Sequence, residues 1–557
     1  MSSEDYLLSW SKRVPPESRL LDPLGLGNHL TIQGEFTPGI TSVTDRMRYF
    51  TNLAWYWQNF SNEKDPDKRI GTKFFERTFI ISCLAHHGGD SEYPGFFRVF
   101  GKSMFSKNWN EISNFELDFK ISGQGKTYYN ANLEKLGGAY TDDFGRIILT
   151  TVNSKLASCL SLDKKLFYDK SFTKTNLKTK FSNFCICDSD KNPTEEEIIS
   201  KMFFGFVDSN KNDFDIDEKS FAEFMNKKIN LDFDKDQPLL TKSMEIKQMG
   251  LKRRNTLFIF LKILHANDLQ IPVKSIDLRR AMWDGIYFKQ AAYDKSKIDF
   301  KKLENARRYW EYFQLNVYYV FVIEIILYVI IEIITKNPGI LKNNLIKKIS
   351  QKSTEKSFES LLDTKILTSD SLQKLQSVSW SKISSQESSL DDEINEATLY
   401  DYLEDSDSIE DDIAGSLVML FFLQKRFQGT EQKIKDFKKS AKISRFIEDR
   451  LSIEYVLGKC NMQKPIFEFL EEMMVAIVNR HILEASIDFS ERGTKNWIFA
   501  EEEGALYITR KKEYRIKAKD NRWSSILNLL TDAKFITIKN DLYTLTEKGR
   551  LWLSKIS

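Results

Sequence analysis

The sequence predicts a mainly helical protein of several domains, in which the β-structure is limited to small hairpins. The chain holds only 24 Gly and 11 Pro among 557 residues, roughly half the average share of these turn-forming residues. This scarcity favours long helices with short connections over a β-sandwich or a propeller. At roughly 150 residues per domain, the length suits three or four domains.

Charge and composition are those of a soluble intracellular protein. Lys and Arg number 82 and Asp and Glu 79, so the molecule as a whole has no strong field that would attract a polyanion. The N-terminus shows no basic stretch followed by an apolar one, and therefore no secretory signal. The sequence predicts a cytoplasmic protein with reduced cysteines and no cofactor.

One apolar segment, residues 315–334, is long enough to cross a bilayer. Asn316, Glu324, Tyr328 and Glu332 recur within it at helical spacing and form one polar stripe. A carboxylate at the centre of a lone membrane helix costs on the order of 2–3 kcal/mol. We therefore expect a buried helix of a soluble protein, with a membrane helix as the alternative.

The N-terminal region predicts irregular structure followed by two core helices. Residues 20–45 contain several glycines and two prolines, which favours loops. Apolar residues at three- and four-residue steps then predict one helix beginning at Thr44 and another after Gly71. The second helix aligns Phe75, Phe79 and Cys83 on one face.

Two segments share an order of helix, strand, tight turn and strand. In residues 128–160, a glycine pair ends a helical stretch and a β-rich run follows an Asp-Asp-Phe-Gly turn. At the C-terminus, residues 523–530 predict a helix, 534–538 and 542–545 two strands, and 546–551 a closing helix. This order, with Leu-Thr-x-x-Gly after the second strand, resembles the winged-helix superfamily. The resemblance implies one or two winged helix-turn-helix modules.

A change in composition marks an internal boundary. Residues 383–424 contain no Lys or Arg, which predicts an exposed acidic linker with a short helix near Leu399. The predicted domains follow in order: 1–165, an N-terminal helical domain ending in a winged-helix-like unit; 166–382, a central helical domain; 383–415, the acidic linker; 416–500, a helical segment; and 501–557, a C-terminal winged helix.

Two motifs for nucleotide and calcium binding are incomplete. Residues 123–127, GQGKT, end like a phosphate-binding loop, but Lys120 stands where that pattern needs glycine. Asp208 and Asn210 imitate a calcium loop whose twelfth position is Lys219 instead of glutamate. Both segments are therefore expected to be polar loops.

Metal-binding residues are present but poorly spaced. Cys185 and Cys187 lack a second cysteine pair at zinc-finger spacing. The adjacent His86 and His87 are expected to point in different directions on a helix, which makes a shared metal difficult. The sequence therefore predicts no metal site and no catalytic cluster.

An enzymatic alternative remains open at Asp118 and Lys120. An acid-x-Lys triplet on a strand, with a second acid nearby, can hold Mg²⁺ and activate water for phosphodiester hydrolysis. Residues 115–121 alternate as a strand does, although no upstream acid is clearly placed. This triplet is the basis for a metal-dependent nuclease as an alternative function.

The strongest functional signal is a basic segment near the C-terminus. Residues 504–522 contain seven basic and two acidic residues, interleaved with Tyr507 and Tyr514. Such a segment can neutralise phosphates and release counterions, and it also suits docking to an acidic protein surface such as residues 391–412. The predicted DNA-binding residues are Arg510, Lys511, Lys512, Arg515, Lys517, Lys519 and Arg522. Two smaller basic clusters, residues 252–254 and 347–348, are expected to be solvated helix faces.

Several N-terminal motifs are similar to those of uncharacterised bacterial proteins from defence loci. They are residues 22–25 (DPLG), 37–41 (TPGIT), Thr44-x-Arg46-x-Arg48-Tyr49-Phe50 with Trp55, and 307–324. The group supplies no catalytic residues to transfer. The order of winged helix, helical middle, acidic linker and winged helix also resembles, in layout only, the kleisin subunits of SMC-type ATPase complexes.

These features favour a non-catalytic DNA-binding or scaffold subunit of a prokaryotic defence complex acting on phage or plasmid DNA. Its expected partners are DNA and other protein subunits, an ATPase being one candidate, and no membrane. The alternatives are the metal-dependent nuclease and a kleisin-like subunit.

Overall fold

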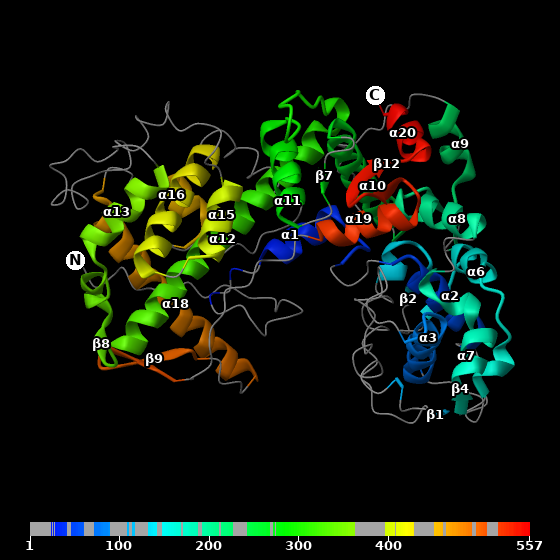
Figure 1. Ribbon diagram of the computed structural model, residues 1–557, viewed down its shortest axis with the longest axis horizontal. Coiled ribbons are helices and arrows are strands. Elements are labelled where there is room, and N and C mark those ends of the chain that lie inside the picture. The colour runs from blue at the N-terminus through cyan, green and yellow to red at the C-terminus, as the bar shows by residue number, and fades with distance from the viewer. Residues whose placement is uncertain are drawn as a thin grey trace. The chain divides into compact units, whose positions relative to one another are not determined.

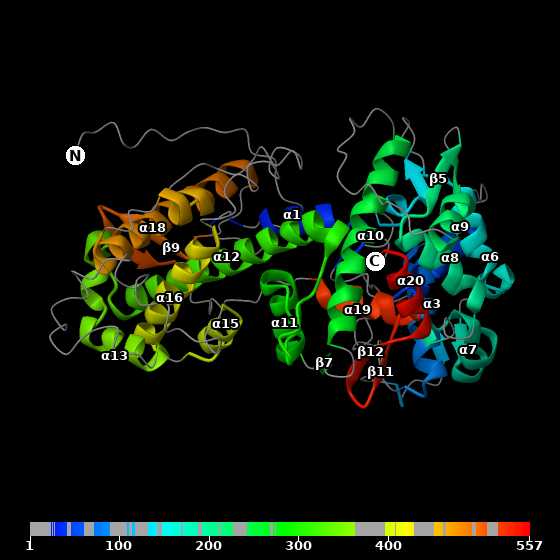
Figure 2. The ribbon, with the colours of Figure 1, turned by 90° about the horizontal axis from the view of Figure 1, so that it is seen from above.

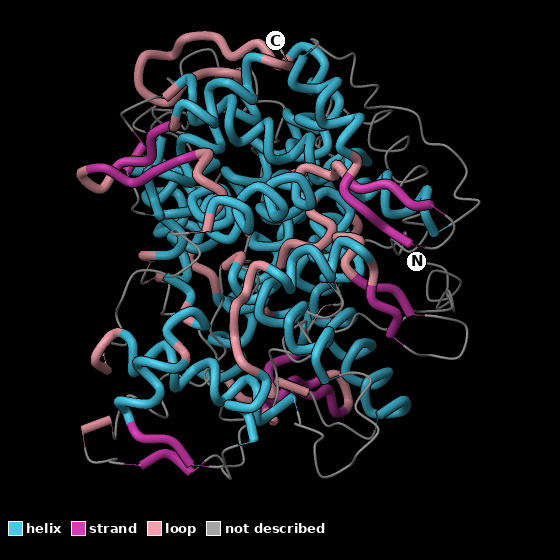
Figure 3. Tube along the Cα trace, turned by 90° about the vertical axis from the view of Figure 1, so that its right-hand side faces the viewer, coloured by secondary structure: helices cyan, strands magenta, loops and turns pink. Residues whose placement is uncertain are grey.

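The computed structural model confirms a mainly helical fold in which the described sheets have two or three strands (Figure 3). The structure describes residues 24, 26, 28–41, 46–60, 72–89, 109–110, 114–116, 132–141, 147–168, 171–187, 192–210, 213–226, 242–267, 271–272, 275–362, 396–406, 408–427, 451–459, 464–492, 497–509 and 522–556.

The chain forms two compact units that alternate along the sequence. The first unit comprises Met1–Ile32 and Glu311–Lys519, and the main unit comprises Gln33–Trp310 and Asp520–Ser557. The division falls inside two helices, α1 (Asn28–Phe36) and α12 (Glu304–Lys336). The units therefore differ from the five consecutive segments that composition predicted, and residues 501–557 are shared between both units.

The first unit is built around the apolar part of α12. Tyr319 donates a hydrogen bond to the carbonyl of Leu451 at 2.8 Å, and Phe321 packs on Tyr400 at 4.2 Å. A three-stranded antiparallel sheet has the order β8-β10-β9. The other elements are β8 (Ile340–Leu341), α13 (Gln351–Leu362), α15 (Glu396–Glu404), α16 (Ile409–Phe427), a π-helical turn (Glu454–Lys459), α18 (Ile466–Arg492), β9 (Phe499–Glu502) and β10 (Ala505–Ile508).

Burial accounts for the membrane-like composition of α12. Among the described helices it is the one long and apolar enough to cross a membrane, yet 78% of its most apolar window is buried inside the fold. Asn316 and Glu324 are buried as well, at 4% and 3% exposure. The helix is thus packed like the core helix of a soluble protein, as the polar stripe predicted. It ends at Lys336, before the Asn-Pro-Gly stop.

Part of the predicted acidic linker is helical. The short helix expected near Leu399 is α15, and α16 already begins at Ile409, before the predicted linker ends. Glu396 is fully buried and pairs with Arg426 at 3.0 Å. The acidic composition predicts solvated side chains, but Glu396 is a buried carboxylate that pairs with a cation from α16.

The main unit begins with a helical cluster that encloses an aromatic core. Its helices are α2 (Arg48–Phe60), α3 (Thr72–His86), α6 (Thr151–Ser158) and α7 (Lys174–Lys180), with 3₁₀ turns at Lys164–Tyr168 and Ser182–Phe184 and the strand pair β1 (Asn114–Glu116) and β4 (Ser171–Thr173). The helices predicted from Thr44 and Gly71 are confirmed as α2 and α3. Residues 20–45, expected to be irregular, contain α1. Phe75, Phe167 and Phe184 pack on one another with centroids 5.1–5.8 Å apart.

Three hairpins in the main unit are built on one backbone pattern, one more than the sequence predicted. They are β2 (Ala139–Thr141) with β3 (Ile147–Leu149), β5 (Val207–Asn210) with β6 (Asp213–Ile216), and β11 (Ile536–Lys539) with β12 (Leu542–Leu545). The middle hairpin follows α8 (Pro193–Phe203) and precedes α9 (Glu218–Asn226), and it contains the residues that imitated a calcium loop.

In each hairpin a residue in left-handed backbone ends the preceding helix, namely Gly137, Gly205 and Lys534. The next amide reaches back five residues, as Phe206 does to Lys201 at 2.8 Å and Phe535 to Leu530 at 2.9 Å. The carbonyl of the residue after the left-handed one then accepts a hydrogen bond from the backbone amide of the N-cap residue of the helix that follows the hairpin. Those pairs are Thr150 with Gly138, Asp217 with Phe206, and Thr546 with Phe535.

The C-terminal hairpin completes a sheet with a strand from the middle of the chain. β7 (Ile271–Pro272), which follows α10 (Lys242–Ala266) and precedes α11 (Ser275–Trp283), pairs with β12, so the sheet order is β7-β12-β11. The flanking helices are α19 (Trp523–Asp532) and α20 (Glu547–Ser554), and Figures 1 and 2 show α20 beside α10. A Cβ at Gly549 would lie 2.2 Å from the carbonyl oxygen of Phe535, which explains the glycine of the Leu-Thr-x-x-Gly motif.

The basic cluster at residues 252–254 is structural, so the expectation of a solvated face is wrong for its two arginines. Arg253, 1% exposed, donates hydrogen bonds to the carbonyls of Met202, Phe203 and Pro38 at 2.6–2.8 Å. Arg254, 8% exposed, donates to Phe204 and to Gly205. The carbonyls at the end of α8 have no partners within that helix, and guanidinium groups satisfy them. Lys347 and Lys348 are exposed, as expected.

Candidate metal centre

His86 and His87 lie where α3 ends and its backbone changes direction. The amide of His87 donates to Cys83 at 3.1 Å, and the amide of Gly89 donates to Leu84 at 2.7 Å. Gly88 and Gly89 have φ of +66° and +89°, a conformation that glycine adopts without strain. The His-His-Gly-Gly sequence therefore stops the helix and leaves both imidazoles at its last turn.

Cys185 and Cys187 follow a 3₁₀ turn that is held firmly against α2 and α3. Phe184 is fully buried and packs edge-on against Phe75 and Phe79 of α3, with centroids 5.1 and 5.2 Å away. Asn52 of α2 donates to the carbonyl of Phe184 at 3.1 Å. The aromatic face that the sequence predicted on α3 thus positions the cysteines beside its C-terminal end.

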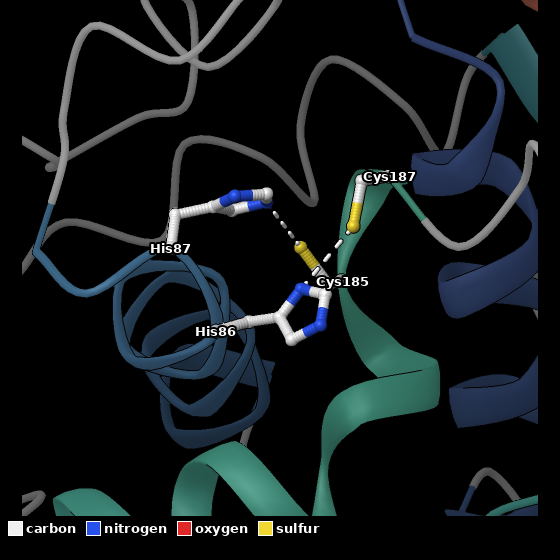
Figure 4. A group of neighbouring side chains, drawn as sticks. All are labelled: His86, His87, Cys185 and Cys187. Carbon is white, nitrogen blue, oxygen red and sulfur yellow. Dashed lines mark hydrogen bonds between the residues drawn. The ribbon is translucent and has the colours of Figure 1, made fainter.

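The four side chains converge on one point, as Figure 4 shows. Nε2 of His87 lies 3.2 Å from Sγ of Cys185, and Nδ1 of His86 lies 3.2 Å from Sγ of Cys187. All four of these atoms lie within 4.8 Å of one another. The two rings are 5.0 Å apart and inclined by 70°, so adjacent histidines here face a common centre. They can do so because His86 presents Nδ1 and His87 presents Nε2.

A third thiol adjoins the cluster. Cys83, one helical turn before His86, is fully buried and hydrogen bonds with Cys185. Hydrogen bonding to Cys187 lowers the pKa of the Cys185 thiol, but the hydrogen bond with Cys83 and burial outweigh this and raise the pKa above its ordinary value. Cys185 is buried and Cys187 is half-buried.

Two kinds of chemistry suit this donor set. Two thiols and two imidazoles form the set that binds Zn²⁺ tetrahedrally. Alternatively, each Cys–His contact is the geometry of a nucleophile and its base. The sequence predicts no metal site because Cys185 and Cys187 have no second cysteine pair at zinc-finger spacing. The second pair is the two histidines about a hundred residues earlier, and the glycines after them were the available signal.

The predicted nucleic-acid residues are mostly outside the described part of the chain. Of the seven, the structure describes Arg522, which donates to Oγ1 of Thr37 at 2.9 Å and to the carbonyl of Ile40 at 2.8 Å. This arginine therefore binds the chain itself through one guanidinium nitrogen, and its predicted role in DNA binding stays a prediction. Arg510, Lys511, Lys512, Arg515, Lys517 and Lys519 lie outside the described residues, as do Asp118, Lys120 and residues 123–127.

The N-terminal motifs singled out in the sequence have structural roles in the main unit. Thr37 and Ile40 are fully buried, and Arg522 and Arg253 bind the turn between them. Arg46 pairs with Asp532 of α19 at 2.9 Å, and Arg48 forms a buried pair with Glu195 of α8. These residues join the N-terminal helices to later parts of the main unit.

Fold and site together define the class of protein: a helical protein with repeated helix–hairpin–helix units and one Cys₂His₂ cluster among the described residues. Comparison with protein-family models, curated proteins and solved structures finds no match.

Proposed function

We propose that this protein is a non-catalytic, cytoplasmic subunit that binds DNA and joins other proteins in a prokaryotic defence complex. The observation that carries the proposal is the charge of the segment between β10 and α19. Residues 504–522 hold seven basic and two acidic residues in a chain whose net charge is only +3. In the sequence, this segment runs from the first unit to the main unit.

The burial of α19 determines which kind of DNA contact is expected. Seven of its ten residues are buried, including Ile526, Leu530 and Asp532. A helix with so little free surface offers few side chains to the edges of bases in a groove. The proposed contacts therefore go to phosphates, and binding should depend on salt and hardly on sequence.

The repeated hairpin units support the scaffold part of the proposal, because winged modules serve in both nucleic-acid binding and protein docking. The resemblance of the N-terminal motifs to bacterial defence-locus proteins supports the biological setting. An ATPase is one candidate partner, since the sequence lacks a complete phosphate-binding loop of its own.

The test measures binding of a fluorescent DNA duplex of arbitrary sequence between about 50 and 200 mM salt. Neutralising Arg510, Lys511, Lys512 and Arg515 together should weaken binding at least about tenfold, and should reduce the slope of log Kd against log salt by about 3–4. A matched control neutralises four exposed lysines elsewhere: Lys178, Lys180, Lys219 and Lys297.

Equal losses in both variants would contradict the location of the site. Mg²⁺-dependent cleavage of plasmid DNA that disappears in Asp118→Ala would contradict the non-catalytic role and favour the nuclease alternative.

A further inference from the structure

We propose that His86, His87, Cys185 and Cys187 bind one Zn²⁺ ion as a closed structural site. Each of the four contributes one ligand atom, so the protein fills all tetrahedral positions. Structural zinc sites are closed in this way, whereas catalytic ones keep a position for water or substrate.

The distances fit a tetrahedral ion. With Zn–N of about 2.0–2.1 Å and Zn–S of about 2.3 Å, neighbouring ligand atoms lie about 3.3–3.8 Å apart. Both Cys–His pairs are already at 3.2 Å, and the widest separation among the four atoms is at most 4.8 Å. Binding therefore needs the widest separation to close by at most about 1–1.5 Å, which side-chain rotation of the half-buried imidazoles can provide.

The surroundings hold the ligands in place without a metal. Cys185 follows the buried Phe184, whose carbonyl accepts from Asn52, and His86 is the last residue of α3. Cys83 hydrogen bonds with Cys185 from the adjacent turn of α3, as groups around a metal site commonly do with a ligand sulfur. The zinc would link two segments about a hundred residues apart in sequence.

The chemistry of binding is balanced. Two neutral thiols become thiolates and release two protons, while both imidazoles bind in their neutral forms. Softer thiolate ligands together with imidazole favour zinc over Mg²⁺ or Ca²⁺, which prefer oxygen. The competing interpretation, a Cys–His nucleophile, needs an accessible thiolate; the structure buries Cys185, so Cys187, which is half-buried, is the one candidate among these two cysteines.

The first experiment uses the full-length wild-type protein and requires no variant to fold. The metal is removed with a chelator, circular dichroism verifies that the chain remains folded, and Co²⁺ is titrated in as a spectroscopic substitute for zinc. We expect one Co²⁺ per chain, visible absorption typical of tetrahedral cobalt, and near-ultraviolet charge transfer from thiolate to metal. Both bands should vanish when one equivalent of Zn²⁺ is added. A folded protein that shows no thiolate charge transfer would overturn the proposal.

The second experiment tests the ligand assignment. His86→Asn and Cys187→Ser should each weaken zinc binding roughly a hundredfold or more, given the apparent binding free energy shared by four ligands. The control is Cys159→Ser, which removes a half-buried cysteine whose thiol donates to the carbonyl of Lys155 instead. Unchanged zinc affinity in both ligand variants, or an equal loss in the control, would overturn the assignment.

Alkylation separates the metal site from a nucleophile. With zinc bound, Cys185 and Cys187 should resist iodoacetamide until a chelator is added, whereas Cys159 should react equally in both states. Rapid alkylation of Cys187 that zinc does not slow would favour the Cys–His nucleophile and contradict the proposal.

Discussion

Single residues in this protein often bind several partners at once, and Glu304 shows the consequence for its ionisation. It begins α12 and pairs with Arg307 at 3.0 Å and with Lys289 at 2.7 Å. Burial alone would raise its pKa, but hydrogen bonds from these two cations outweigh burial and lower the pKa from 4.5 to about 2. A carboxylate with a depressed pKa stabilises the fold above its ordinary pKa, and this contribution is lost as pH falls from about 4.5 toward 2.

Glu304→Gln should therefore lower the free energy of unfolding by about 2 kcal/mol at pH 7. This is less than the full pKa shift corresponds to, because solvent screens the partly exposed carboxylate of Glu304. Its difference from the wild type should shrink as pH falls below about 4.5. Urea unfolding at several pH values measures this difference. Glu223→Gln, at an exposed position of α9, should differ from the wild type by less than about 0.5 kcal/mol. A difference for Glu304→Gln that does not change with pH would contradict the ion-pair explanation.

At the scale of elements, close backbone contacts decide where glycine is needed. Gly205 ends α8 with φ of +68°, and a Cβ there would lie 2.5 Å from the backbone of Gly250 in α10. Gly205 and Gly250 therefore allow α8 and α10 to approach closely, while Arg253 and Arg254 satisfy the carbonyls at the end of α8. In α1, by contrast, a Cβ at Gly34 would have nothing within 4 Å.

Gly205→Ala should lower stability by about 3 kcal/mol or more, since the clash is with backbone and the left-handed conformation adds further strain. Gly34→Ala should raise stability by about 0.5–1 kcal/mol, as expected inside a helix with free space. Thermal unfolding of the two variants tests the pair. Similar shifts for both would show that the contact between Gly205 and Gly250 is not close.

For the molecule as a whole, the last segment, Asp520–Ser557, belongs to the same unit as Gln33–Trp310. Trp552 of α20 is 4% exposed and packs on Phe204 and Phe535 with centroids 4.8 Å apart. β12 also pairs with β7 from the middle of the chain. Residues 33–310 and the C-terminal segment thus belong to one unit, whereas the kleisin-like layout has its two terminal modules apart.

Cleavage within residues 510–521, at an introduced protease site, should therefore leave residues 522–557 bound to the rest of the protein. Size-exclusion chromatography should show both fragments in one peak under native conditions and separate them only in denaturant. Trp552→Ala should release the small fragment or weaken its retention, because removing a buried tryptophan costs about 3–5 kcal/mol. A fragment that elutes separately without this substitution would contradict the shared unit.

Local patterns were enough to predict the helical class, the main helices and the C-terminal hairpin, because periodicity and turn chemistry act over a few neighbouring residues. Gly137, the Asn-Pro helix start at Asn192 and the stop after Lys336 are signals of this local kind. Contacts across the fold show that Arg253 and Arg522 bind backbone carbonyls and that each of the two units is built from two separate stretches of the chain. The tertiary structure alone placed His86 beside Cys187. These features depend on contacts between residues 50 to nearly 500 positions apart, and no local pattern specifies which distant segments will meet.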